Sequence, residues 1–224
     1  LYETFVIGKP YPKNNEAVLR FFEPNLTLFL ILISFVFSML GVVFVVRYLH
    51  HQTMLSITTS RDKVDWGRIR FSFSFWALFT IVSTLSFYHY NPNDFEINFK
   101  PVPFAILAVI GLLLIPIQTS SEEYIFRGYL MQGFGNLAKN KWFPLLMTSL
   151  IFGAMHISNP EVSKLGNIIM VYSIGTGFFL GVITLMDEGM VLALGFHAAK
   201  NLVGALLVTF DWSAFQTHSI LKDS

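Results

Sequence analysis

The chain has 224 residues, of which 54% are hydrophobic and only 13% are charged. A soluble domain carries about a quarter charged residues, so this composition excludes an ordinary soluble protein and predicts a polytopic membrane protein. The lack of cysteine excludes disulfides, thiolate metal sites and a cysteine nucleophile, and a formal net charge of +1 without a large basic surface excludes nucleic acid as a partner.

In chain order, the first 25 residues are mixed and too polar for a signal peptide, which predicts an arm ahead of the membrane. Six apolar segments follow, and a helix needs roughly 20 apolar residues to cross a bilayer. They cover residues 26–46, 71–90, 103–117, 142–157, 168–186 and 190–210. The expected fold is therefore an all-α, multi-pass membrane helix bundle of about six transmembrane helices.

The basic residues of the short loops predict how the bundle is oriented, because cytoplasmic loops are enriched in lysine and arginine. Five of them lie between the first two spans: Arg47, Arg61, Lys63, Arg68 and Arg70. The turns near residues 139–141 and 187–189 fall on the same side by parity. We expect this side to be cytoplasmic. The short loops further suggest a bacterial source, and hence an integral protein of the bacterial inner membrane in contact with lipid.

Three polar clusters interrupt the apolar segments, and ionisable groups at membrane depth are costly enough to suggest a function. The first cluster, EEYIFR, contains Glu122, Glu123 and Arg127. Because positions four apart share a helix face, Glu123 is expected to pair with Arg127, while Glu122 points about 100° away and stays free. An ordinary salt bridge at a helix end explains this cluster about equally well.

The other two clusters each contain a histidine. FGAMH runs from Phe152 to His156, and FHAAKN places His197 and Asn201 one helical turn apart. Each also fits a role in helix packing when taken alone. A rise of 1.5 Å per residue places Glu122 and His156 level, each about 25 Å from the turn near residue 140. The three clusters are therefore expected to form one buried polar site in the cytoplasmic half of the bilayer.

Such a site has the groups needed to hydrolyse a peptide bond without a covalent nucleophile. A carboxylate facing a histidine can hold a water molecule and remove its proton as the water attacks a carbonyl. A second histidine and an asparagine can donate to the oxyanion that forms. Two histidines and a carboxylate could instead bind zinc and leave a position open for water.

The three clusters, in this order, fit the patterns EExxxR, FxxxH and HxxxN. In this respect the sequence resembles the type II CAAX prenyl endopeptidases and their bacterial relatives, the bacteriocin-processing and abortive-infection membrane proteases. The resemblance covers about residues 103–210. It implies an intramembrane endopeptidase acting on a membrane-associated peptide or protein. Since most bacteria do not prenylate proteins, a CAAX substrate is not expected there.

The resemblance also implies a role for each matched residue. Glu122 would activate the water with the help of His156, and His197 and Asn201 would stabilise the oxyanion. Three further residues would support the site: Glu123, Arg127 and Phe152. It implies a metal-free mechanism, with zinc on Glu122, His156 and His197 as the alternative.

The predicted organisation has four parts: an N-terminal arm (1–25), two accessory transmembrane helices with the basic loop (26–102), a catalytic membrane core (103–210) and a C-terminal tail (211–224). A different class of function is also compatible with the sequence. A catalytically silent membrane scaffold, or a protein that binds a small ligand in association with transport, could keep the same polar residues for helix packing.

Overall fold

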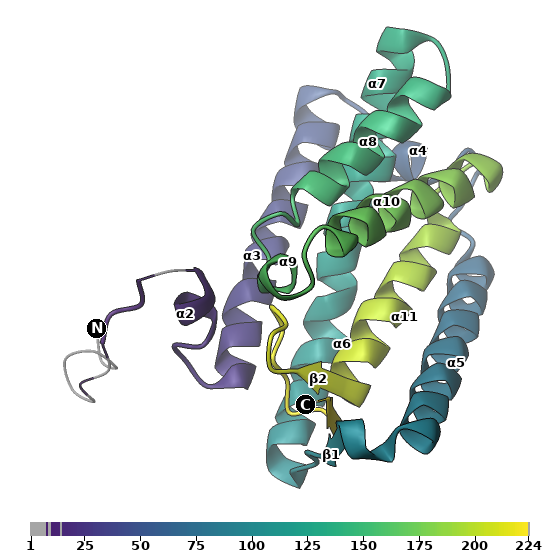
Figure 1. The fold of residues 1–224 in the computed structure, drawn as a ribbon. Helices are drawn as coiled ribbons and strands as arrows, with labels where there is room; N and C mark the ends of the chain where they lie inside the picture. Colours follow the sequence, from purple (N-terminus) through teal and green to yellow (C-terminus); the bar gives the residue numbers. More distant parts are fainter. Residues whose placement is uncertain (1–7, 9, 14, 224) are drawn as a thin grey trace.

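The computed structural model describes residues 8, 10–13 and 15–223, so parts of the predicted N-terminal arm lie outside the described residues. Six longer helices follow one another: α3 (Pro24–Phe44), α5 (Trp66–Tyr90), α6 (Pro101–Glu123), α8 (Trp142–Ala154), α10 (Ile168–Met186) and α11 (Val191–Leu207). Shorter helices accompany them: α2 (Asn15–Leu19), α4 (Met54–Thr58), η2 (Pro92–Asp94), α7 (Met131–Ala138) and α9 (Pro160–Leu165). Two π-helical turns, η1 (Val45–Leu49) and η3 (Tyr124–Leu130), extend α3 and α6 (Figure 1).

Four helical stretches of the described residues are long and apolar enough to cross a membrane: Pro24–Leu49, Trp66–Tyr90, Pro101–Ala138 and Ile168–Met186. The predicted all-α membrane bundle is thereby confirmed. The fourth and sixth expected spans are the shorter apolar helices α8 and α11. At 1.5 Å per residue they rise only about 20 and 26 Å. α8 ends at Ala154, where the chain turns before α9 begins at Pro160, and α11 ends where the chain becomes a strand.

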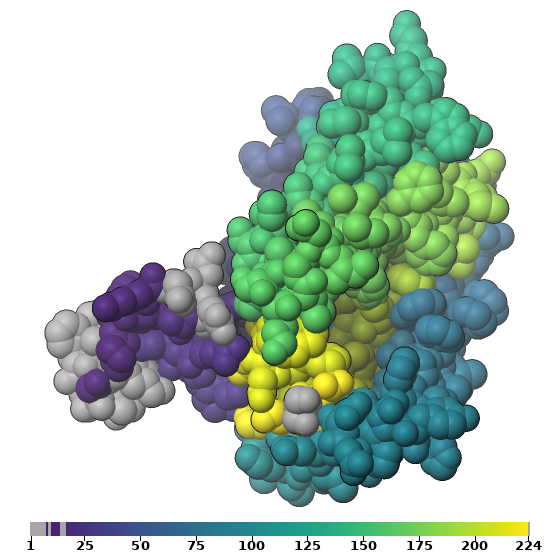
Figure 2. Space-filling view, in the orientation of Figure 1, coloured from purple at the N-terminus to yellow at the C-terminus, as the bar shows by residue number. Residues whose placement is uncertain are grey.

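The outer helix α5 has the surface expected of a lipid-facing helix. None of its residues is fully buried. Four of its phenylalanines, Phe71, Phe75, Phe79 and Phe87, leave more than half of their surface exposed. In the space-filling view α5 lies along one flank of the molecule (Figure 2). Its exposed aromatic surface supports contact with lipid as the environment of this flank.

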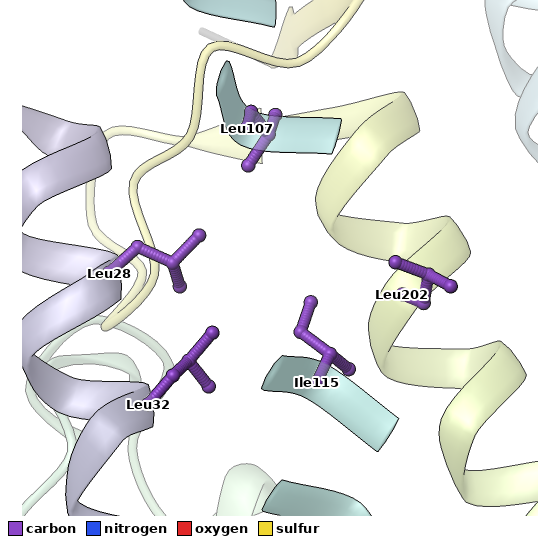
Figure 3. Close-up of a cluster of buried hydrophobic side chains, with 5 residues drawn as sticks. All are labelled: Leu28, Leu32, Leu107, Ile115 and Leu202. Atoms are coloured by element: carbon purple, nitrogen blue, oxygen red, sulfur yellow. The ribbon is translucent and has the colours of Figure 1, made fainter. Parts of the chain in front are cut away.

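One cluster of the apolar core lies between α3, α6 and α11. Leu28 and Leu32 of α3 face Leu107 and Ile115 of α6, and Leu202 of α11 closes the cluster (Figure 3). α11, although last in the chain, packs against both α5 and α6, while α8 packs on α10. The central position of α11 brings its histidine and asparagine next to the glutamates of α6.

At the end of the bundle that carries α4 and α7, the basic loop contacts the turn between α10 and α11 (Figure 1). The backbone of Met190 donates to Thr58 O at 2.8 Å. Arg61 binds the buried carboxylate of Asp187 at 3.0 Å, and Arg68 binds the same oxygen. The loop and this turn therefore lie on one side of the bundle, as the alternation of spans predicts.

The opposite end carries a small sheet that the sequence did not lead us to expect. β3 (Leu221–Asp223) lies between β1 (Phe95–Ile97), which is antiparallel to it, and β2 (Val208–Phe210), which is parallel. Much of the predicted C-terminal tail is thus attached to the bundle.

Glu23 makes a second connection to the C-terminal segment at this end. It caps α3 by accepting from the backbone of Leu26, and its other oxygen lies 2.6 Å from Nε2 of His218. Burial favours a higher pKa for Glu23, but hydrogen bonds from the Asn25 and Leu26 backbone and from His218 outweigh it and hold the pKa below its ordinary value of 4.5.

Candidate active site

The two adjacent glutamates lie at the junction between α6 and the π-helical turn η3. α6 ends at Glu123, and the next seven residues have the wider π-helical spacing. Turns of this kind occur mostly as local bulges within α-helices and are frequent at functional sites. At this junction the side chains of Glu122 and Glu123 point in different directions, because neighbouring positions on a helix lie on different faces.

Glu123 is the buried member of the pair. Its Oε1 accepts from Nη1 of Arg127 at 3.0 Å, and both side chains are fully shielded from solvent. The predicted ion pair is therefore present. The same oxygen lies 2.7 Å from Nδ1 of His197 on α11. Arg127 also donates through Nη2 to the backbone carbonyl of Gly177 on α10, at 3.0 Å. This cluster ties α6, η3, α10 and α11 together.

Glu122 has a different environment. Its side chain keeps 17% of its surface exposed, and its two oxygens face different groups. Oε1 accepts from Nε2 of Gln118 at 2.7 Å, and Oε2 lies 3.6 Å from Nε2 of His197. Glu122 thus lies beside the buried ion pair while its own side chain stays partly exposed, which is the arrangement that a group reacting with water requires.

The hydrogen bond from His197 to Glu123 determines what the other ring nitrogen can do. An ionised carboxylate only accepts hydrogen bonds, so Nδ1 of His197 must carry a proton. In the neutral ring Nε2 then has a free lone pair, and in the protonated ring Nε2 is a second donor. Because Nε2 lies on the side of Glu122, the ring presents it to the accessible part of the site.

Asn201 joins the same network one turn further along α11. Its Nδ2 donates to Oε1 of Gln118 at 3.1 Å. Gln118 is 3% exposed and therefore connects Asn201 to Glu122 through a buried amide. The structure thus brings five of the predicted site residues together in two hydrogen-bonded groups. Glu123, Arg127 and His197 form one, Glu122 and Asn201 are joined through Gln118 in the other, and the two meet at the 3.6 Å contact between His197 and Glu122.

Phe152 of α8 and His156, in the turn after α8, border these groups. The Arg127 guanidinium lies 4.8 Å from the centre of the Phe152 ring, at cation–π distance. Phe152 also packs against the rings of His156 and His197, with centroids 4.9 and 6.2 Å away. Nδ1 of His156 lies 2.8 Å from the carbonyl oxygen of Phe152. Within the described part of the chain, this oxygen is the hydrogen-bond partner of the His156 ring. Phe152 therefore separates His156 from the buried ion pair.

The donor set does not fit a catalytic zinc. Such a site needs three protein ligands around one point, with a fourth position for water. Within residues 8, 10–13 and 15–223, no three histidine, aspartate or glutamate side chains are grouped to hold a metal. Since Nδ1 of His156 bonds to a backbone carbonyl and Nδ1 of His197 to Glu123, only the Nε2 atom of each ring could bind a metal.

Two members of the network did not emerge from the sequence. Gln118 lies one turn before Glu122 in an apolar run, and an amide in that place is a signal that could have been recognised. The carbonyl of Gly177 gives no such signal, because a backbone group is not visible in a motif. Its environment explains the glycine: a Cβ there would approach the Ser149 backbone at 3.1 Å, so α10 lies unusually close to α8.

Comparison with known proteins agrees with the resemblance seen in the motifs. Residues 98–203, just under half of the chain, match the family model described as "Type II CAAX prenyl endopeptidase Rce1-like". The match includes every candidate site residue and the buried Gln118. No solved structure gives a significant match to the chain.

A relative from Bacillus subtilis (strain 168), "Uncharacterized protein YyaK", is 32% identical over 196 residues. The aligned region covers 87% of this chain and 65% of that protein. The similarity therefore extends beyond the matched segment, although the chain spans only about two thirds of the length of its relative. By its motifs and by the family match, the segment of residues 98–203 is similar to the Rce1-like family of type II CAAX prenyl endopeptidases.

Proposed function

We propose that this protein is an intramembrane endopeptidase that hydrolyses a peptide bond in a membrane-associated peptide or protein. The observation that carries the proposal is the contrast between two adjacent glutamates. Glu123 is fully buried against Arg127, whereas Glu122 is accessible beside a histidine. If both glutamates served only helix packing, the bundle would not need to keep Glu122 partly exposed within a membrane-spanning stretch.

Glu122 is the proposed water-activating group. Its carboxylate takes a proton from a bound water as the water oxygen attacks the carbonyl carbon of the scissile bond. The carbonyl oxygen becomes an oxyanion, and Asn201 and protonated His197 are the proposed donors to it. Collapse of the tetrahedral intermediate breaks the C–N bond, and the proton held by Glu122 passes to the leaving amine.

His156 is the proposed assistant to Glu122. A carbonyl oxygen can only accept, so Nδ1 of His156 carries the proton that it donates to Phe152 O. Nε2 of the neutral ring is then a free acceptor. Since Phe152 holds the ring by both its backbone and its aromatic face, the acceptor is fixed in direction, and this supports a role in relaying the water proton.

The other residues of the cluster are proposed to hold this group in place. Arg127 neutralises Glu123, and Glu123 fixes the ring of His197 through Nδ1. A carboxylate that orients a histidine in this way also selects its tautomer, as in other hydrolases. The ring of Phe152 covers the Arg127 guanidinium on the side that faces α8.

The substrate class follows from where the site lies. The glutamates belong to a stretch long and apolar enough to span a membrane, so a chain that reaches them is associated with the bilayer. The description of the matched family refers to CAAX prenyl endopeptidases. We propose the broader class, a membrane-associated peptide or protein, for this chain.

The test is a comparison of membrane proteomes from cells that produce either the wild type or Glu122→Gln. We expect peptides with new termini in the first sample that are absent in the second. Glu96→Gln, which removes an exposed carboxylate of β1, is the matched control and should behave as wild type. If the wild type and Glu122→Gln yield the same termini while both proteins accumulate, the protease proposal is wrong, and a catalytically silent scaffold becomes the better explanation.

A further inference from the structure

Gln118 forms the centre of a three-residue chain of hydrogen bonds from α6 to α11. Its Nε2 donates to Oε1 of Glu122 at 2.7 Å, and its Oε1 accepts from Nδ2 of Asn201 at 3.1 Å. One buried amide therefore contacts both the proposed water-activating carboxylate and a proposed oxyanion donor.

The direction of each bond in this chain is fixed by the bond before it. An ionised carboxylate only accepts, so Gln118 must turn its NH₂ group toward Glu122. Its carbonyl oxygen then points to the other side, and Asn201 must meet this oxygen with its own NH₂ group. One N–H of Asn201 is used in the bond, and the other remains available to donate. In the reverse orientation, Asn201 would present a carbonyl oxygen that repels an oxyanion.

Packing alone does not account for a glutamine in this position. The side chain is 3% exposed and lies in a stretch that can span a membrane. Burying an amide costs free energy unless its groups are hydrogen-bonded, and an apolar residue would fill the space at no such cost. Thr119, the next residue along, is buried too, but its hydroxyl bonds only to the backbone of its own helix.

We infer that Gln118 is a positioning residue, which turns the NH₂ group of Asn201 toward the reacting carbonyl whenever Glu122 is ionised. The inference deepens the proposed function and rests on it, because Glu122 and Asn201 have roles only if the site hydrolyses a peptide bond. The orientation of Asn201 can nevertheless be observed without any substrate, so the two ideas can fail separately.

The first experiment is spectroscopic. The protein is labelled with ¹⁵N-asparagine and studied by NMR in detergent micelles. The signals of the Asn201 NH₂ group are assigned by their loss in Asn201→Leu. The two NH₂ protons of any asparagine differ in shift, and in the wild type we expect the bond to Gln118 to move the bonded proton away from the shift of a solvated asparagine. In Gln118→Met, which keeps the side-chain length but has no amide, that proton should move back toward the solvated value. If its shift is the same in the wild type and in Gln118→Met, the inference is overturned.

The second experiment is kinetic and uses a fluorescence-quenched prenylated CAAX peptide as the probe. Misplacing a catalytic group slightly can cost as much as about 100-fold in rate. We expect Gln118→Met to lower kcat by about 10- to 100-fold and to change KM by less than about threefold. Thr119→Val, a matched buried control, should keep both values near wild type. An effect confined to KM, or shared equally by Thr119→Val, would overturn the inference.

A double variant tests whether Gln118 acts through Asn201. Residues that act as one unit are strongly non-additive, so Gln118→Met should lower kcat by less than about threefold further in an Asn201→Leu background. Gln118→Leu, which has no group to donate to Glu122 or to accept from Asn201, should be about as slow as Gln118→Met. Fully additive losses, or wild-type kcat in Gln118→Leu, would refute the positioning role. If the wild type does not cleave the peptide but the NMR shifts respond as expected, the proposed activity on this probe fails and the positioning stands.

Discussion

The two glutamates should differ in what they contribute to stability. In Glu123→Gln the Arg127 guanidinium loses its paired carboxylate and stays buried, keeping the Gly177 carbonyl, the substituted amide and the rings of Phe126 and Phe152. Breaking one side of a buried ion pair costs about 3–5 kcal/mol. For a chain of this size, 1 kcal/mol corresponds to roughly 2–4 °C in Tm, so Glu123→Gln should lower Tm by roughly 6–20 °C.

Glu122→Gln should cost far less. Glutamine at this position can still accept the hydrogen bond from Gln118, and the partly exposed side chain leaves no buried cation behind. A cost of about 1 kcal/mol or less is expected, or roughly 2–4 °C in Tm at most. The assay is thermal unfolding of the purified variants in one detergent, with cleavage of a reporter peptide followed in parallel. Both variants should be inactive, while only Glu123→Gln is strongly destabilised.

The double variant Glu123→Gln with Arg127→Met provides the sharpest control. Replacing both members of a buried ion pair by uncharged groups is often neutral for stability, so the double variant should recover much of the Tm lost in Glu123→Gln and remain inactive. Equal losses of Tm in Glu122→Gln and Glu123→Gln, or a double variant less stable than Glu123→Gln, would contradict the division between a structural and a reacting carboxylate.

Three further outcomes are expected. Purified protein should hold less than one equivalent of zinc and keep its cleavage activity in chelator; stoichiometric zinc that alone restores lost activity would contradict this. His197→Gln should lower turnover roughly 10²–10³-fold and leave the acid limb of the pH–rate profile in place, whereas His156→Gln should move that limb; the reverse would mean that the two histidines exchange roles. Glu23→Gln should flatten the loss of Tm on acidification from about pH 6 to 3. The reason is that a carboxyl whose native pKa lies below the ordinary 4.5 contributes stability that is lost as the pH falls through that pKa. Identical Tm–pH curves for the wild type and Glu23→Gln would show that the contact with His218 contributes nothing.

Local rules made part of this structure predictable. Helical periodicity is enough to pair Glu123 with Arg127, because both lie on one helix and four positions apart. The apolar runs likewise predict the bundle, since a hydrophobic segment of that length has few other uses. Both features depend on residues that are close in the sequence.

What depends on the packing of separate helices was harder to predict. Counting the helical rise placed Glu122 and His156 level, but it carries no information on helix rotation, and in the structure His197 is the histidine that lies 3.6 Å from Glu122. The link from Gln118 to Asn201 joins positions 83 apart, and no motif contains both. The small sheet at the chain end is similarly hidden, because three-residue strands are too short for a period-two pattern to be recognised.

The contact between the basic loop and the turn before α11 has a consequence for biosynthesis. Thr58 accepts its hydrogen bond from Met190, a residue made roughly 130 positions later, and translation at about 5–20 residues per second separates the two by many seconds. α3 is already made when this interval begins and α5 is made early in it, while the helix that packs against α5 does not yet exist. Nascent chains released before α11 would therefore leave α5 without its main partner and Glu123 without His197. We expect the membrane quality-control machinery to treat them as orphaned segments.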